Sequence, residues 1–206
     1  TSASIAALNS KQVQALTSTQ IVALTTAQIS NLETTTLQAL TVKQVAALET
    51  SDIALLGSSK ITALSSAQLK ALTTSQVAGL TTAQLNSMGS TQISQFKADQ
   101  LPTLSTSTLN QLDANALGGL SGTQVLGLTT SQITGMSTAA LSRLSTAALA
   151  ALKTNQIVAL NTAQLASLSS FATMALTVTQ IAALETRDLA NLTTANFAVL
   201  FSTQVG

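Results

Sequence analysis

The chain has 206 residues, and its composition excludes most kinds of catalytic and metal site. It contains no His, Cys, Trp or Tyr, so the usual transition-metal ligands, thiol chemistry and the commonest general base are missing. Eight Lys and Arg against seven Asp and Glu give a net charge of +1, without the basic surface that binds nucleic acids. We therefore expect no enzyme, no catalytic residues, no cofactor or metal site, and no nucleic-acid partner.

Apolar residues are abundant, and the mean hydropathy is +0.42, but they are scattered along the chain. The longest apolar run covers 147–152, whereas a helix that spans a bilayer needs about 20 apolar residues. No basic stretch followed by an apolar one opens the chain. We expect no membrane insertion.

An eight-residue repeat organises the whole chain. Counting position 1 at residues 1, 9, 17 and so on, 25 repeats fill residues 1–200 without insertion. Position 8 is Leu in 22 of 25 repeats, position 5 is apolar in 25 of 26, and position 4 is Gln in 15 of 26. None of the charged residues falls at position 2, 5 or 8. Positions 5 and 8 are therefore predicted to form the core, with the small residues of position 7 allowing close packing.

Neither a continuous helix nor a strand fits this period. At 100° per residue, eight residues leave a drift of about 80° per repeat, so the apolar stripe would wind around a single helix. In a strand, positions 5 and 8 would point to opposite faces. The chain must therefore turn once in every repeat.

The first regular repeats, 17–24 and 25–32, show how each helix begins. Thr25 followed by Gln28 is a capping box, in which each side chain satisfies the backbone N–H of the other residue. The same pattern recurs at Thr73 with Gln76 and at Asn161 with Gln164. We predict a helix over about positions 2 to 8 of each repeat, and an all-α solenoid of about 25 short capped helices that occupies residues 1–206 as one domain.

Residues 97–136 depart most from the repeat pattern. Pro102 lies at position 6, where it removes a helical hydrogen bond. Five glycines follow, namely Gly118, Gly119, Gly122, Gly127 and Gly135. The stretch is interpreted either as a bend or docking site, or as drift in a repeat that tolerates faults; the second interpretation is preferred.

Repeat 169–176 contains the one polar residue at position 5, Thr173. Phe171 and Met174 lie beside it, and we expect this repeat to repack around a displaced apolar side chain. At the ends, Ile5, Leu8 and Val205 keep the core register without a polar capping repeat. Since solenoids need such caps for solubility, we expect a fragment of a longer array or copies stacked end to end.

Position 2 is the surface feature with the most regular chemistry, being Ser or Thr in 21 of 26 repeats. One interpretation is a ligand face for ice, a glycan or another filament; the other is packing beside the cap. Val42 and Val178, which share the shape of Thr without its hydroxyl, favour packing. The candidate ladder comprises Thr26, Thr34, Thr50, Thr74, Thr82, Thr130, Thr138, Thr146, Thr154, Thr162, Thr186 and Thr194, and position 2 of the irregular stretch adds Thr106.

Two sequence segments resemble those of a known group of repeat proteins, namely ALTTAQI (residues 23–29) and TVTQIAALETRDLA (residues 177–190). The chain resembles the Thr/Gln-rich octapeptide arrays of very large exported bacterial proteins, described as type I-secreted adhesins, RTX-like or haem-utilisation proteins. The Gly/Asp nonapeptides of RTX domains are absent, and no His or Tyr is available to ligate haem. The resemblance implies an extracellular or cell-surface location.

A structural role is the favoured functional hypothesis. We expect a rod that serves as a spacer, adhesin stalk or self-assembling fibre, whose partners are flanking domains or other copies of the chain, end to end or side by side. The alternative is a binding module for ice or a glycan that uses the position 2 ladder.

Overall fold

The computed structural model describes residue 5 and residues 7–203, with the side chains of residues 5 and 7–200. Val205, expected to continue the core register, lies outside the described residues. Within them the fold is all helical, with 22 α-helices and one 3₁₀ helix. They are α2 (Ser10–Gln14), α3 (Ser18–Val22), α4 (Thr26–Ser30), α5 (Thr34–Ala39), α6 (Val42–Ala47), α7 (Thr50–Leu55), α8 (Ser58–Thr62), α9 (Ser66–Ala71), α10 (Thr74–Ala78), α11 (Thr82–Ile93), η1 (Leu101–Thr103), α12 (Thr106–Gln111), α13 (Ala114–Gly118), α14 (Gly122–Val125), α15 (Thr130–Gly135), α16 (Thr138–Leu141), α17 (Thr146–Ala151), α18 (Thr154–Val158), α19 (Thr162–Ala166), α20 (Ser170–Met174), α21 (Val178–Ala182), α22 (Thr186–Ala190) and α23 (Thr194–Thr203).

The predicted capping boxes start the helices. The Gln28 N–H donates to Thr25 Oγ1 at 3.3 Å, and the Thr25 N–H donates to Gln28 Oε1 at 2.8 Å. The boxes at Thr73 with Gln76 and at Asn161 with Gln164 are also present. These bonds matter because a helix of five or six residues consists almost entirely of end groups.

Most helices end earlier than expected; only α11 and α23 continue through position 8 of their repeat among the described residues. The prediction extended each helix to position 8, but α5 ends at position 7 with Ala39, and many others end at position 6. Leu40 and Thr41 then take extended backbone angles, with ψ of 135° and 158°. This places the position 8 side chain at the corner of the turn, where it points into the core. Among the described residues, only Gly89 needs a positive φ, at 63°, in the kink inside α11.

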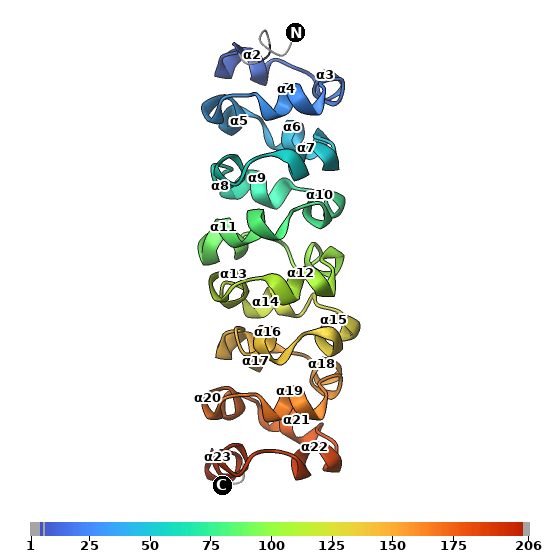
Figure 1. Cartoon of the computed structure of the whole chain (residues 1–206), viewed down its shortest axis with the longest axis vertical. Helices are drawn as coiled ribbons and strands as arrows, with labels where there is room; N and C mark the ends of the chain where they lie inside the picture. The colour runs from blue at the N-terminus through green and yellow to red at the C-terminus, as the bar shows by residue number, and fades with distance from the viewer. Residues whose placement is uncertain (1–4, 6, 204–206) are drawn as a thin grey trace.

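The short helices stack into a superhelical rod, as Figure 1 shows from the N-terminal to the C-terminal end. Helix α3 packs against α6 and α6 against α9, while α17 packs against α20 and α20 against α23. Each of these contacts joins repeats three apart, and the glutamine bonds described below join repeats four apart. The superhelix therefore has between three and four repeats per turn, and the predicted solenoid is confirmed.

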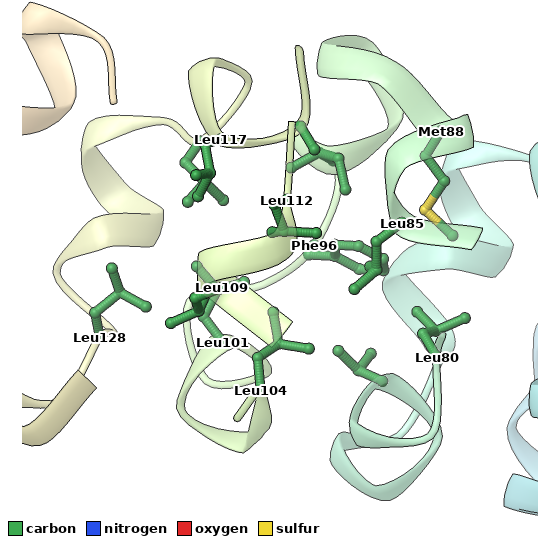
Figure 2. Packing of buried hydrophobic residues seen from close by; sticks show 14 of the residues in the cluster. Leu80, Leu85, Met88, Phe96, Leu101, Leu104, Leu109, Leu112, Leu117 and Leu128 are labelled. Atoms are coloured by element: carbon green, nitrogen blue, oxygen red, sulfur yellow. The ribbon is translucent and has the colours of Figure 1, made fainter. Parts of the chain in front are cut away.

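Positions 5 and 8 form one continuous core along the rod, as predicted. Figure 2 shows its middle section, where Leu80, Leu85, Met88, Phe96 and Leu101 come from consecutive repeats and lie in the interior between the helices. Both Met88 and Phe96, which replace Leu at position 8, are at most 5% exposed. Burial of this apolar surface is the main favourable term that orders helices too short to be stable alone.

The prediction for repeat 169–176 is wrong. Thr173 stays in the core position at 1% exposure, and its hydroxyl donates to the Ser169 carbonyl oxygen at 3.1 Å. Phe171 and Met174 do not replace it, since they are 76% and 41% exposed. Because the hydroxyl finds a backbone acceptor within its own helix, Thr is tolerated there without repacking.

Two glycines at position 7, Gly79 and Gly135, lie against the turn that precedes them. A Cβ built on Gly79 would lie 2.3 Å from the Thr50 methyl, and one built on Gly135 would lie 2.7 Å from the Thr106 methyl. In both pairs, position 2 of one repeat faces position 7 of the repeat three further on. The close approach predicted from the small residues is therefore an inter-turn contact.

The irregular stretch 97–136 continues the rod (Figure 1). Pro102 replaces the α-helix of its repeat by the 3₁₀ helix η1. A Cβ on Gly127 would lie 2.0 Å from the Ala98 carbonyl oxygen, and one on Gly119 would lie 2.5 Å from Ser90 Cα. At both positions the backbone of the preceding turn lies so close that a side chain would clash with it. The preferred interpretation of this stretch as drift does not explain that fit.

Replacing Gly127 by Ala is expected to lower the free energy of unfolding by about 1–3 kcal/mol, since the new methyl group overpacks a backbone contact. Gly118→Ala in the same stretch is the control, because its Cβ would meet only the Arg143 carbonyl oxygen at 3.5 Å, an ordinary contact. Removing a glycine from inside α13 should raise stability by about 0.5–1 kcal/mol. Urea denaturation of both variants gives the sign of each change in the free energy of unfolding. Equal changes in the two variants would contradict this packing.

Candidate functional site

The glutamine at position 4 joins two turns of the rod. In repeat 129–136, Gln132 Oε1 accepts the Thr129 N–H at 2.8 Å and so closes the capping box. Its Nε2 donates to the Leu101 and Leu104 carbonyl oxygens at 3.0 and 2.7 Å. Those two carbonyls belong to positions 5 and 8 of the repeat four before. The same amide thus caps its own helix and bonds the preceding turn.

This arrangement recurs along the rod and is called the glutamine ladder here. Its members share an Nε2 that donates to a carbonyl oxygen 28 to 31 residues earlier. They are Gln44, Gln68, Gln76, Gln84, Gln92, Gln100, Gln124, Gln132, Gln156, Gln164 and Gln180. All except Gln92 are buried. The position 5 carbonyl oxygens that it reaches also accept the position 8 N–H of their own repeat, as Leu101 does from Leu104. The ladder therefore matters most for the position 8 carbonyl groups, which a purely apolar interface would leave unpaired.

The capping-box argument missed this second bond. A capping box accepts Glu as readily as Gln at its fourth position, yet no repeat has Glu at position 4. A carboxylate there would set negative oxygen atoms against carbonyl oxygens. The frequent Gln together with the absence of Glu indicates that an amide donor is favoured at position 4.

Other side chains replace the glutamine bond at several repeats. Thr36 Oγ1 donates to the Leu8 carbonyl oxygen at 3.0 Å, and Asn196 Nδ2 donates to the Leu168 carbonyl oxygen at 2.8 Å. Where position 4 is Ala140, Arg143 Nη1 reaches the Leu112 carbonyl oxygen at 2.8 Å from position 7. In these three repeats the inter-turn bond is therefore kept by a different donor.

Asp52 is a buried position 4 residue that cannot supply this bond. It lies at position 4 and is 1% exposed; its Oδ2 accepts the Glu49 N–H at 2.9 Å, as expected for an acid at a helix start. Its Oδ1 is buried without a hydrogen-bond partner. The register of the ladder directs this atom toward the Ile21 and Leu24 carbonyl groups, which are also acceptors. The turn around Asp52 thus lacks a donor that most other turns have.

We expect Asp52→Gln to raise the free energy of unfolding by about 1–3 kcal/mol, because it supplies the missing donor to a buried acceptor. The control is Asp113→Asn: Asp113 Oδ1 accepts only the Ala116 N–H, at 2.8 Å, and Asn caps a helix as well as Asp. That control should change stability by less than about 0.5 kcal/mol. Denaturant titrations measure both changes. If Asp52→Gln does not raise the free energy of unfolding, the glutamine ladder does not contribute to stability as described.

The candidate threonine ladder lies at the first residue of each helix. Eight of its members are exposed, namely Thr50, Thr74, Thr130, Thr138, Thr146, Thr154, Thr186 and Thr194. Four are partly buried, namely Thr26, Thr34, Thr82 and Thr162. Since a turn holds between three and four repeats, Thr138, Thr146 and Thr154 face different sides of the rod.

Some ladder residues contact the next turn. The methyl groups of Thr50 and Thr106 face Gly79 and Gly135. Thr162 Oγ1 donates to Asp188 Oδ1 at 3.0 Å, and Asp188 is 3% exposed. The two methyl contacts are packing roles of the kind that Val42 and Val178 favour, whereas Thr162 uses the hydroxyl that Val lacks. The ligand-binding interpretation stays a prediction.

The charged cluster at 185–188 is only partly exposed. Arg187 Nη2 lies 3.3 Å from Glu185 Oε2, and both side chains are exposed. Asp188, in contrast, is buried at position 4 and lies 3.8 Å from Arg187 Nε. In the part of the chain that the structure describes, no cluster of three or more metal-ligating residues and no pocket occurs.

Comparison with known families agrees with the repeated architecture. Residues 1–26 and 45–82 match the ALTTAQ repeat family. The chain is a tandem-repeat protein. The matched segments contain α2, α3 and α7 to α10, which are ordinary turns of the rod. No curated protein matches the chain. Within the described residues, no helix is long and apolar enough to cross a bilayer.

Proposed function

We propose that this chain is a structural rod of an extracellular or cell-surface bacterial protein, in which it holds functional domains apart. The observation that carries the proposal is the glutamine ladder, which bonds successive turns from Gln44 to Gln180. Together with the continuous core, these bonds resist bending and sliding between turns. The resemblance to exported octapeptide arrays supports the location.

A spin-label distance measurement tests the rod. The chain has no Cys, so Lys11→Cys and Thr179→Cys provide two unique labelling sites, both exposed, near the two ends. A stiff spacer predicts one narrow distance distribution in solution. A broad distribution, as from a flexible chain, would overturn the proposal. Gln132→Glu in the same labelled chain should broaden the distribution by loosening one turn.

Labelling of cells tests the proposed location. Antibodies against the rod should stain intact cells that make the natural protein. Staining that appears only after the cells are lysed would contradict an extracellular or surface location, and it would leave the mechanical role of the rod untouched.

The exposed threonines support one second candidate, a binding module for ice. Thr130 and Thr154 lie three repeats apart, so they occupy neighbouring turns on similar sides of the rod. Thermal hysteresis and ice recrystallisation assays with Thr130→Lys/Thr154→Lys test it. We expect no activity in the parent chain. Activity that these changes abolish would replace the spacer proposal.

A further inference from the structure

Oxygen atoms without a hydrogen-bond donor meet between two turns of the rod at Asp52. Asp52 is 1% exposed, and its Oδ1 atom has no hydrogen-bond partner. It follows Ile21 by 31 residues and Leu24 by 28, the spacing at which the glutamine ladder donates to carbonyl oxygens of the preceding turn. The Leu24 carbonyl oxygen accepts no hydrogen bond from the described residues. A carboxylate and a pair of carbonyl groups thus face each other as acceptors.

Asp188 shows how the rod compensates a second buried carboxylate at position 4. Its Oδ1 atom accepts the Thr162 hydroxyl at 3.0 Å, and Arg187 Nε lies 3.8 Å away. Thr26 holds the equivalent place 26 residues before Asp52 and is partly buried, but it does not donate to Asp52. No Lys or Arg of the described residues forms an ion pair with Asp52. The compensation found at Asp188 is therefore absent at Asp52.

The carbonyl groups of this turn already bind a positive charge one repeat further on. Lys60 lies at position 4 of the repeat after that of Asp52, and its ammonium group donates to the Ser30 carbonyl oxygen. A cation can therefore take the place of the amide in the glutamine ladder. Asp is one methylene shorter than Gln, so its carboxylate ends about 1.5 Å short of the place of a ladder amide. Calcium joins such separated oxygen atoms, since it lies about 2.3–2.6 Å from each ligand.

We propose that Asp52 and the turn before it bind one calcium ion. The ligands are Asp52 Oδ1, the carbonyl oxygens of Ile21 and Leu24, and the Thr26 hydroxyl, and water completes the shell. Calcium takes oxygen ligands, so the lack of His and Cys does not exclude this site. With a single carboxylate, we expect a dissociation constant of about 10⁻⁴–10⁻³ M, the range of weak extracellular sites. The site goes beyond the spacer role, which does not depend on it.

Isothermal titration calorimetry and urea denaturation of the full chain, with calcium chloride and with EGTA, test the proposal. We expect one ion per chain. At about 10 mM calcium the equilibrium constant of unfolding should fall about 10- to 100-fold, because the ion binds the folded rod. Asp52→Asn keeps the shape of the side chain and should abolish both effects. Thr26→Val removes one ligand and should weaken binding, while the stability in EGTA stays unchanged.

Asp52→Gln gives an independent readout, because it supplies the missing donor instead of the ion. In EGTA it should be more stable than the parent chain, as expected above. Calcium should narrow this difference, since only the parent chain binds the ion. A difference that calcium leaves unchanged would overturn the proposal.

Asp113→Asn is the matched control, because it removes a carboxylate at another helix start and should keep the calcium response. Sodium chloride at equal ionic strength controls for screening, and magnesium chloride controls for selectivity, since Mg²⁺ requires shorter bonds and near-ideal octahedral geometry. Loss of the response in Asp52→Asn together with its retention in Asp113→Asn would support the site. No response in the parent chain, a response that persists in Asp52→Asn, or an equal response to sodium or magnesium would overturn the calcium site.

Discussion

Gln132→Glu is expected to lower the free energy of unfolding by about 3–5 kcal/mol, since it leaves an uncompensated buried charge. Gln132 is 5% exposed, and its Nε2 donates at 3.0 and 2.7 Å to two carbonyl groups of the preceding turn. The substituted carboxylate would lose both bonds and face the two carbonyl oxygens. Urea denaturation followed by circular dichroism measures the loss.

Gln20→Glu is the matched control for this prediction. Gln20 also closes a capping box, with the Thr17 N–H at 2.8 Å, but it is exposed and its Nε2 makes no inter-turn bond to the described residues. A carboxylate near a helix N-terminus is favourable, so the control should change stability by less than about 0.5 kcal/mol at low protein concentration. Equal losses at Gln20 and Gln132 would assign the effect to capping and contradict the inter-turn role.

Leu160→Ala is expected to cost about 2–5 kcal/mol, the usual range for truncation of a buried leucine. Leu160 is 3% exposed at position 8, and the rod offers little room for its surroundings to collapse. Thr154→Ala, at an exposed position 2, should cost less than about 1 kcal/mol in the same denaturation experiment. Comparable losses would contradict the assignment of position 8 to the core.

Thr162→Ala, although also at position 2, is not a neutral surface change. Its hydroxyl donates to the buried Asp188 carboxylate at 3.0 Å, so its removal leaves a buried acceptor with one partner fewer. We expect a loss between those of Thr154→Ala and Leu160→Ala. The threonines at position 2 therefore contribute unequally to the free energy of unfolding, and the uniform sequence at this position does not show the difference.

Local chemistry was sufficient to predict one helix per repeat. The Thr25 and Gln28 box, the eight-residue period and the confinement of charge away from positions 5 and 8 all concern a single repeat and its core face. The predicted helices were too long because position 8 was counted as helical. Leu40 is buried although its backbone is extended, and burial alone does not distinguish such a residue from the last residue of a helix.

Contacts between turns could not be predicted in the same way. Whether Gln132 reaches the repeat three or four before depends on the rotation per repeat, which the backbone angles at residues such as Leu40 and Thr41 determine. The presence of glycine at Gly127 is likewise explained only once Ala98, on the turn before it, is known to be its neighbour. The frequent Gln and the absence of Glu at position 4 indicate that an amide is favoured there, but not where it donates.

The most direct test of the rod is a disulfide between neighbouring turns. Thr106 Cβ lies 3.5 Å from the Cβ position at Gly135, within the range of about 3.5–4.5 Å that disulfides require. Thr106→Cys/Gly135→Cys should therefore oxidise within one chain, as a shift in gel mobility and mass spectrometry would show. Thr106→Cys/Ala151→Cys, which joins repeats five apart, should not. A bond in the second pair without one in the first would contradict a superhelix of three to four repeats per turn.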